Sequence, residues 1–363
     1  MELREIGRAF EIEGEFVSAA PHGSGHIHAT YLAEYRLGGR ALRFVHQRIN
    51  TAIFGDPAAV MDNVRRVLSH VHRKLEDLEA ADASRRALTL VPARDGAAFF
   101  RDAEGGWWRT YVFVEGSRTV DVVETPGQAY EAARAFGTFE RMLIDLPPPR
   151  LRATLPGFHH TPGRLEAFRR ALQADPLNRA ASVRDAVAFA EERERLAWSL
   201  EDLAASGAVV ERTVHNDTKV NNVLLDAATG EALCVIDLDT VMPGLALHDF
   251  GDLVRTAACR ATEDEPDVSR VVVEPALFEA LARGWLEALS GHVGAEERAS
   301  LVLAGKVITF ECGLRFLTGH LSGDRYFRTH RPGHNADRCR AQFALVRSLE
   351  VQEERLAGIV ARL

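Results

Sequence analysis

Two short apolar segments with polar side chains at their outer ends constrain the fold most. Residues 215–226 read HNDTKVNNVLLD, residues 232–240 read ALCVIDLDT, and the turn AATGE joins them. A hairpin with so short a turn brings its outer ends side by side, so Asp217 and Asn222 are expected near Asp237. Clustered carboxylate and carboxamide oxygens are costly unless a cation neutralises them, and Mg²⁺ prefers such ligands. A capped turn with a solvated strand end is the alternative, but it does not need this many different functional groups.

These residue types match the chemistry of phosphoryl transfer. That reaction uses an acid that accepts a hydroxyl proton, an asparagine and an aspartate on a metal ion, and a lysine near the transferred phosphate. The spacing Asp-x4-Asn followed by Ile-Asp is more specific than any one of these residues. The two segments together therefore predict a reaction centre.

Composition places the chain among ordinary globular proteins. It has 363 residues, 46% of them apolar, and a formal net charge of -8, which argues against a nucleic-acid or anionic-membrane partner. The start MELREIGRAFEIEGEF has no apolar signal segment, and no run approaches the roughly 18 apolar residues that span a bilayer. The four cysteines are far apart, so we expect reduced, buried thiols in a cytoplasmic protein; they are Cys234, Cys259, Cys312 and Cys339.

The pattern changes near Glu115. Before it, the chain reads as strands with one helix over residues 60–78, for which Asp56-Pro57 is a plausible start. After it, the hairpin is the only strand-like part, and the remaining segments look helical: 128–146, 162–173, 181–205, 274–290, 296–320 and 336–361. The predicted fold class is α+β with two lobes: a small antiparallel-sheet lobe, residues 1–115, that binds nucleotide, and a larger, mostly helical lobe, residues 116–363, that holds the catalytic and substrate-binding groups.

The motifs resemble those of a known enzyme superfamily. HNDTKVNNVLLD followed by VIDLDTV resembles the catalytic and metal loops of the aminoglycoside phosphotransferase-like small-molecule kinases. HNDTKVNN and IDLDTVMPG are most similar to the N-acetylhexosamine 1-kinases, as are HGSGHIHAT, QRINTAIFGDP, CGLRFLTGHLSGDRYF and RPGHN. Because the matching stretches run in order through nearly the whole chain, the resemblance implies the two-lobed protein-kinase-like fold.

The resemblance implies roles for the hairpin residues. Asp217 becomes the base or hydroxyl-orienting acid, Lys219 a phosphate contact, and Asn222 and Asp237 the magnesium ligands. Asn221 would start the strand or brace the loop. The other acids and the histidine are expected to do less: Asp239 helps a second metal ion through water or only forms hydrogen bonds, Asp249 or its competitor Asp252 braces the catalytic loop, and His215 braces that loop through backbone hydrogen bonds.

The nucleotide is expected between the lobes. The loop GSGH, residues Gly23, Ser24, Gly25 and His26, can cradle phosphates with its N–H groups. His22, His26 and His28 are candidate contacts or plain surface histidines. The kinase-like fold places adenine against the backbone around Phe113, Val114 and Glu115.

One residue that such kinases share is missing. They usually place a lysine on the third strand, paired with a helix glutamate, to hold the α- and β-phosphates. Here the third strand reads ALRFVHQRIN, and Lys74 is the only lysine before Lys219. Either Arg48 or Gln47 takes the place of the lysine at the phosphates, or no residue does. The pairing acid is equally in doubt, because Glu76 lies late and Asp62 early in the helix.

The acceptor is expected beside Asp217. The hexosamine-kinase resemblance makes Arg315 and Tyr326 substrate-binding, together with Asp217. An arginine in an otherwise apolar helix is costly unless it is paired or solvated, and a structural ion pair of Arg315 with Asp324 is the alternative.

The sequence thus predicts an ATP- and Mg²⁺-dependent kinase for a small-molecule acceptor. The best guess for the acceptor is the anomeric hydroxyl of an N-acetylhexosamine, an amino sugar, which would give a sugar 1-phosphate. One alternative is a kinase for another alcohol, such as homoserine, a choline-like amino alcohol, a thioribose or an aminoglycoside. The other is a catalytically silent nucleotide-binding protein, suggested by the missing lysine.

Overall fold

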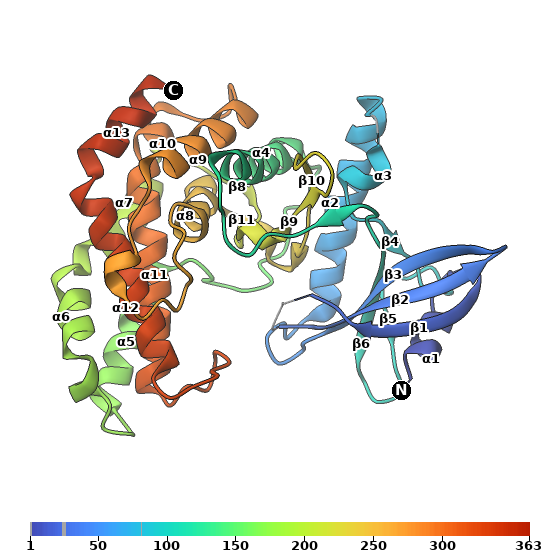
Figure 1. The fold of residues 1–363 in the computed structure, drawn as a ribbon, viewed down its shortest axis with the longest axis horizontal. Helices are drawn as coiled ribbons and strands as arrows, with labels where there is room; N and C mark the ends of the chain where they lie inside the picture. Colours follow the sequence, from blue (N-terminus) through green and yellow to red (C-terminus); the bar gives the residue numbers. More distant parts are fainter. Residues whose placement is uncertain (1, 24–26, 81) are drawn as a thin grey trace.

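An antiparallel sheet forms the N-terminal part of the computed structural model, which describes residues 2–23, 27–80 and 82–363 (Figure 1). The strand order is β1-β2-β3-β6-β4, with β5 on β6. The strands are β1 (Glu15–Pro21), β2 (Ala29–Leu37), β3 (Arg40–Ile49), β4 (Leu90–Val91), β5 (Phe100–Arg101) and β6 (Trp107–Val112). Helix α1 (Leu3–Arg8) lies at the sheet, and α2 (Pro57–Asp77) and α3 (Ala83–Arg86) stand beside it.

Helix α2 joins the sheet to the C-terminal part. It begins where Asp56-Pro57 predicted, because the Asp56 carboxylate accepts a hydrogen bond from the Ala59 N–H at 3.0 Å. Halfway along its buried face, the Asn63 amide donates to the carbonyls of Arg152 at 2.8 Å and Val241 at 3.3 Å. The helix that follows the third strand is therefore anchored to both parts of the molecule.

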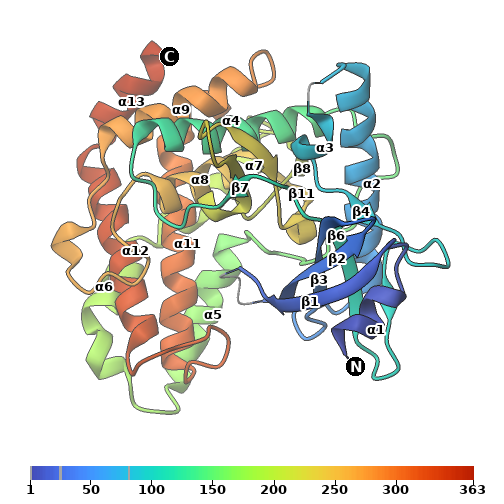
Figure 2. The same ribbon diagram turned by 45° about the vertical axis from the view of Figure 1, so that its right-hand side comes forward.

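The C-terminal part is mostly helical, as expected. Its helices are α4 (Pro126–Leu143), α5 (Thr161–Ala174), α6 (Arg184–Glu192), α7 (Ser199–Ala205), α8 (Ala246–Ala257), α9 (Pro275–Ala288), α10 (Ala295–Ala299), α11 (Leu301–Leu321), α12 (His334–Val351) and α13 (Glu353–Arg362). Figure 2 shows α11 and α12 side by side and α4 against α9. Three predicted helices, 181–205, 296–320 and 336–361, are each divided by short breaks.

The expectation that the hairpin is the only strand-like part of this lobe is wrong. The hairpin strands β9 (Val223–Asp226) and β10 (Ala232–Val235) pair as predicted, but β7 (Ser117–Arg118) adds to β9. A second antiparallel pair joins β8 (Glu211–Val214) to β11 (Met242–Leu245). These strands are too short to show alternation, and β11 contains Pro243 and Gly244, which read as a turn. They matter because β8 and β11 flank the two loops that carry the polar residues.

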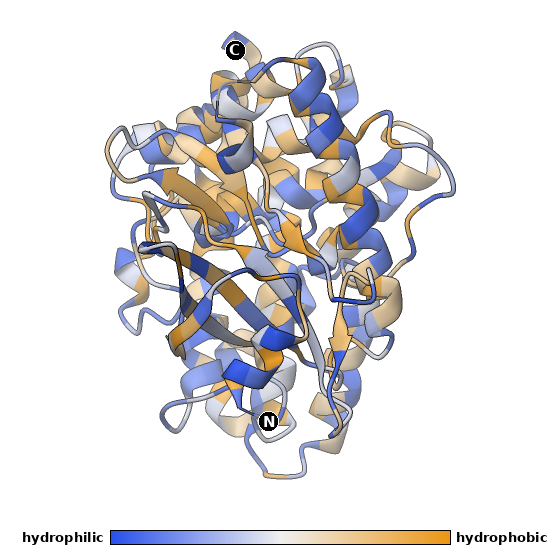
Figure 3. Cartoon of the chain, turned by 90° about the vertical axis from the view of Figure 1, so that its right-hand side faces the viewer, coloured by the Kyte–Doolittle hydropathy of each residue, from blue (hydrophilic) through white to orange (hydrophobic). Residues whose placement is uncertain are grey.

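Apolar residues fill the space between the helices. Helices show alternating hydrophilic and hydrophobic bands, and the strands beneath them carry mainly hydrophobic residues (Figure 3). All four cysteines are free and buried, which confirms the expected burial of the thiols. None of the described helices is both long and apolar enough to cross a membrane.

Helices α4 and α9 approach so closely that glycine is required at their crossing. A Cβ on Gly284 would lie 2.4 Å from the Tyr130 carbonyl oxygen, which is backbone and cannot give way. We expect Gly284→Ala to destabilise the protein by roughly 1–3 kcal/mol, measured by urea unfolding. Glu279→Ala, at an exposed position of the same helix, is the matched control. Equal stability of the two variants would show that the helices can separate without cost.

Candidate active site

The loop between β8 and β9 is held by one buried carboxylate. Asp249, in the first turn of α8, accepts hydrogen bonds from the N–H groups of His215 at 2.7 Å and Asn216 at 2.6 Å. Its backbone oxygen accepts from the Thr218 hydroxyl at 2.6 Å. The role expected of Asp249 or Asp252 thus falls to Asp249, since Asp252 pairs with Arg255 at 2.7 Å. This catalytic loop, residues 215–222, is fixed by local hydrogen bonds.

The catalytic loop is also tied to the segment that carries Asp237 and Asp239. The His215 Nε2 atom lies 3.0 Å from the Ile236 carbonyl, which confirms that His215 braces the loop through the backbone. Asn216 has a φ of 64°, a left-handed conformation that asparagine tolerates, and its amide donates to the Thr240 carbonyl at 3.0 Å. We call residues 236–240 the metal loop. The two loops are held in one fixed relation.

Asp217, Lys219 and Asn222 come together as the spacing predicted. The Asp217 carboxylate lies 2.9 Å from the Lys219 ammonium and accepts from the Asn222 amide at 3.1 Å. Burial opposes ionisation of Asp217, but Lys219 outweighs it and lowers the pKa to about 2. The Asp217 charge in turn raises the pKa of Lys219. Asp217 is therefore an ionised acceptor at neutral pH, suited to orienting a hydroxyl group.

Asn222 and Asp237 fit a hard cation. The Asn222 amide nitrogen also faces the Asp217 backbone oxygen at 2.9 Å, and since that oxygen can only accept, the Asn222 carbonyl oxygen is left for another partner. Burial and the charges of Asp239 and Asp217 raise the pKa of Asp237 to about 6. The charges of His28 and Arg109 lower this pKa by less than burial and the two acids raise it, so Asp237 has too little positive charge around it. Oxygen donors that share an excess of negative charge suit Mg²⁺.

Asp239 does not share this lack of positive charge. Both its oxygens are bound by the guanidinium of Arg109 on β6, one at 2.7 Å, and His28 Nε2 lies 2.6 Å from one of them. Arg109 also reaches Gln47 on β3, its cross-strand partner, at 2.6 Å. Of the two expectations for Asp239, the contacts favour the hydrogen-bonding one. Arg109 was missed from the sequence, because nothing local marks an arginine in a strand as paired; the register of β3 with β6 shows that it faces Gln47.

Arg48 is not brought to this cluster. It follows Gln47 on β3, so its side chain leaves the opposite face of the sheet. There it lies beside Asp102, and its charge helps to lower the pKa of that acid against the effect of burial. Neither acid considered as a lysine partner reaches the cluster: Asp62 pairs with Arg65 on the surface, and Glu76 is exposed.

The expected nucleotide-binding residues are described only in part. Gly23 has a φ of 81°, a left-handed conformation that favours glycine, whereas Ser24, Gly25 and His26 lie outside the described residues. His28 is buried and is no surface histidine. Past the end of β6, the Phe113 N–H donates to the Arg43 carbonyl at 3.0 Å, and the Arg43 guanidinium stacks 4.3 Å from the Phe113 ring.

The other two residues expected near adenine lie directly after Phe113. Val114 is buried, while the Glu115 side chain is exposed and pairs with Arg43. The chain then enters β7, which belongs to the C-terminal sheet. Residues 113–116 therefore form the connection between the two sheets, where the kinase-like fold would place adenine.

Arg315 is half-buried on α11 between two aromatic rings. Its guanidinium lies 5.4 Å from the Phe158 ring and 5.5 Å from the Phe327 ring, and it bonds to Tyr326. The alternative pairing with Asp324 is wrong, because Asp324 binds Arg179 at 2.5 Å. No carboxylate among the described residues forms an ion pair with Arg315.

A histidine links Arg315's helix to the catalytic loop. His159 Nε2 lies 2.9 Å from the Asn216 carbonyl, and Nδ1 lies 2.9 Å from a Glu311 oxygen, one turn before Arg315. Burial disfavours a charged His159, but Glu311 raises its pKa, and Glu311 itself has a pKa lowered to about 2. No local pattern indicates this pair, because 152 residues separate its members.

Glu140 lies behind Asp249. It is buried on α4, bonds to Asp249 and accepts from the Trp285 indole N–H at 3.3 Å. Burial and the Asp249 charge raise the pKa of Glu140 well above its usual value, and burial raises that of Asp249 to about 7. This direction favours a protonated Glu140, which can donate a hydrogen bond to Asp249.

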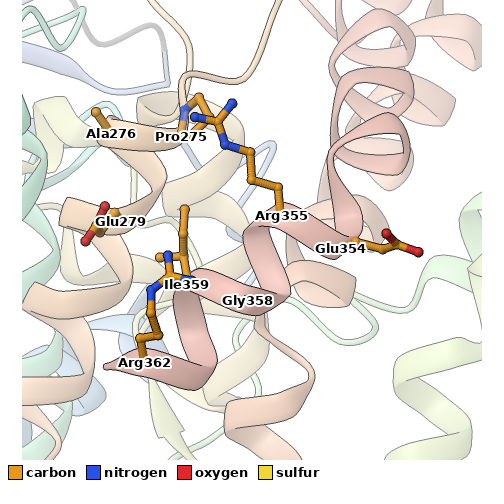
Figure 4. A pocket seen from close by; sticks show the side chains of 8 residues that line it. All are labelled: Pro275, Ala276, Glu279, Glu354, Arg355, Gly358, Ile359 and Arg362. Atoms are coloured by element: carbon orange, nitrogen blue, oxygen red, sulfur yellow. The ribbon is translucent and has the colours of Figure 1, made fainter.

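A hollow elsewhere on the molecule has none of these features. It lies between α9 and α13 and is lined by Pro275, Ala276, Glu279, Glu354, Arg355, Gly358, Ile359 and Arg362 (Figure 4). None of these residues belongs to the catalytic or metal loop. The candidate site is the region between the lobes.

Comparison with known proteins agrees with this geometry. Residues 18–292 match the model of the phosphotransferase enzyme family. The chain resembles an aminoglycoside phosphotransferase from Alicyclobacillus acidocaldarius at 13% identity, with a TM-score of 0.61 over 97% of this chain and 96% of that one. It resembles a choline kinase from Cryptosporidium parvum at 13% identity, with a TM-score of 0.59 over 98% and 96%.

A microcompartment-associated aminopropanol kinase has a TM-score of 0.58 at 16% identity, over 98% of both chains. At such identities these likenesses establish the shared fold. They confirm the predicted two-lobed kinase-like architecture.

Glu140→Gln tests the neutral acid behind Asp249. The stability that protonated Glu140 contributes is complete below the pKa of the unfolded chain and is lost as pH rises through the raised folded pKa. Glutamine stays neutral, so the thermal midpoint of Glu140→Gln should rise relative to the parent as pH increases above the ordinary pKa of a glutamate. Glu140→Ala is the control and should be less stable at every pH by about 1–3 kcal/mol. A constant difference between glutamine variant and parent would mean that Glu140 is ionised.

Proposed function

The chain belongs to the phosphotransferase enzyme family, and from this premise we propose that it transfers the γ-phosphate of ATP to the anomeric hydroxyl of an N-acetylhexosamine. The observation that supports the reaction is the convergence of Asp217, Lys219, Asn222 and Asp237 on two loops held together by hydrogen bonds. The intact set weighs against a silent nucleotide-binding protein.

Each group has a part in the transfer. The acceptor hydroxyl donates to the Asp217 carboxylate, and its oxygen attacks the γ-phosphorus while the bond to the bridging oxygen of ADP breaks. A carboxylate as acidic as Asp217 is a weak base, so it mainly orients the hydroxyl and takes the proton late. Lys219 offsets charge on the transferred phosphate. Asn222 and Asp237 would hold Mg²⁺, which supplies charge neutralisation on the phosphates when bound.

The acceptor side favours a neutral molecule over a cation. Arg315 forms no ion pair with a carboxylate in the part of the chain that the structure describes. It already occupies the aromatic faces of Phe158 and Phe327, which could otherwise hold an ammonium group. The nearby Glu311 is bound by His159 and by the Thr161 hydroxyl at 2.8 Å. Hydroxyl and acetamide oxygens can accept from Arg315. Tyr326, whose exposed fraction is 64%, can close against the same ligand.

The first test is ADP release with ATP, Mg²⁺ and a panel of sugars and amino alcohols. We expect release that depends on an N-acetylhexosamine and falls by at least about 100-fold in Asp217→Asn, because the amide can neither accept the proton nor pair with Lys219. The 1-O-methyl N-acetylhexosamine serves as control and should not be turned over. Phosphorylation of that glycoside would show that the enzyme acts on a hydroxyl other than the anomeric one. If only amino alcohols were phosphorylated, the proposed acceptor would be wrong and an amino alcohol would take its place.

The second test concerns charge. N-acetylglucosamine should exceed glucosamine in kcat/KM by roughly tenfold or more at a pH where the amine is protonated, because Arg315 repels the ammonium group. Arg315→Gln should narrow this ratio. Arg328→Gln, an exposed arginine of the following loop, should leave it unchanged. If kcat/KM were about equal for the two sugars in the parent enzyme, Arg315 would not contact the acceptor.

A further inference from the structure

We propose that Arg109 replaces the missing strand lysine as a positioning residue: it holds the metal loop through Asp239 and does not touch the nucleotide phosphates. The inference rests on the proposed function of the site. It assigns a role to a residue that lies on a different strand from the one the kinase-like fold uses.

The hydrogen bonds of Arg109 are fully used. Its Nε–H donates to the Gln47 side-chain oxygen at 2.8 Å, and one terminal nitrogen donates to that oxygen at 2.6 Å and to Asp239 at 2.7 Å. The other terminal nitrogen donates to Asp239 and to the Met61 sulfur at 3.8 Å. Guanidinium has five N–H groups, and all five have partners. With only 1% of its surface exposed, Arg109 has nothing left to offer a phosphate.

Gln47 stands on the third strand, where the lysine is missing, and faces Arg109. Its side-chain nitrogen donates to the Thr30 hydroxyl at 3.0 Å, which fixes its oxygen toward the guanidinium. Strands β2, β3 and β6 are therefore linked in one row that ends at Asp239. The positive charge that the third strand lacks is carried by its neighbour.

His28 reaches the same carboxylate as a donor. Its Nδ1 atom accepts from the Asn50 N–H at 3.0 Å, so in the neutral ring the proton is on Nε2, which lies 2.6 Å from Asp239. A histidine metal ligand usually donates its other N–H to an acceptor, whereas here the other nitrogen faces a donor. A metal ion could be held by His28, Asp237 and Asp239, which lie close enough together. The hydrogen bonds of His28 instead make it a donor that holds Asp239 in place.

By binding Asp239, Arg109 and His28 hold the metal loop in place. Asp239 is two residues after Asp237, and its backbone oxygen accepts from the Thr154 hydroxyl at 2.9 Å. With the Asp239 charge neutralised by Arg109, Asp237 is left as the carboxylate of this loop that can face a cation. Arg109 thereby acts on the position and charge of a metal ligand.

Arg109→Met and Arg109→Lys test this inference against Arg36→Met, an exposed arginine of the same sheet. Mn²⁺ affinity is measured by electron paramagnetic resonance and ADP affinity by calorimetry, both without acceptor. Turnover is measured with ATP and an acceptor from the panel.

Arg109→Met should weaken Mn²⁺ binding about tenfold or more, as loss of an outer partner of a metal ligand does. It should lower kcat by about 100-fold while KM for ATP changes less than about threefold. Arg109→Lys should have a kcat between those of Arg109→Met and the parent, because lysine keeps the charge but cannot bind both Asp239 oxygens as the guanidinium does.

Other outcomes overturn the inference. Weaker ADP binding and a higher KM for ATP, with unchanged Mn²⁺ affinity, would make Arg109 a phosphate contact. If Arg109→Met fails to fold, the double variant Arg109→Met/Asp239→Leu removes both charges and should fold. Full kcat in that double variant would refute positioning by Arg109. Weaker Mn²⁺ binding with no turnover of any acceptor by the parent would refute the proposed function and leave this inference standing.

Discussion

The site depends on one buried carboxylate at the start of a helix. Asp249 accepts two consecutive backbone N–H groups of the catalytic loop, and these would otherwise be unpaired in an apolar interior. That pairing sets the direction in which Asp217 leaves the loop. Glu140 supports it from behind as a neutral acid. Because both N–H groups are paired within the protein, the loop keeps its shape before any ligand binds.

Local pattern predicted much of this arrangement. The Asp217–Asn222 spacing and the hairpin placed the catalytic and metal loops together, because a short turn leaves little freedom in register. Asp56-Pro57 marked the start of α2 for the same reason: capping is decided by neighbours in the chain. The lobes followed from the change of period near Glu115. The sequence did not indicate β8 and β11, because Pro243 and Gly244 read as a turn and the two paired strands lie far apart in the chain.

Contacts between distant segments could not be predicted in this way. The partners of Arg109 are Gln47 and Asp239, which lie 62 and 130 residues away, and nothing local marks an arginine in a strand as paired. Arg48 looked the better candidate because it lies in the third strand. Alternation excludes it from the cleft, and only the register of β3 with β6 shows that Arg109 faces Gln47.

The two faces of the site differ in how their charges are used. Toward the sheet, all the donors of the cation Arg109 are used, those toward the metal loop on Asp239, so Arg109 fixes geometry and only partly offsets the effects that raise the pKa of Asp237. Toward the helices, the cation Arg315 lies beside aromatic rings and bonds to Tyr326, and it forms no ion pair with a carboxylate of the described residues. A saturated charge can only hold a loop in place, whereas an unsaturated, half-buried charge gains most when a ligand brings acceptors to it. In the function proposed above, one arginine therefore organises the metal loop and the other contacts the acceptor.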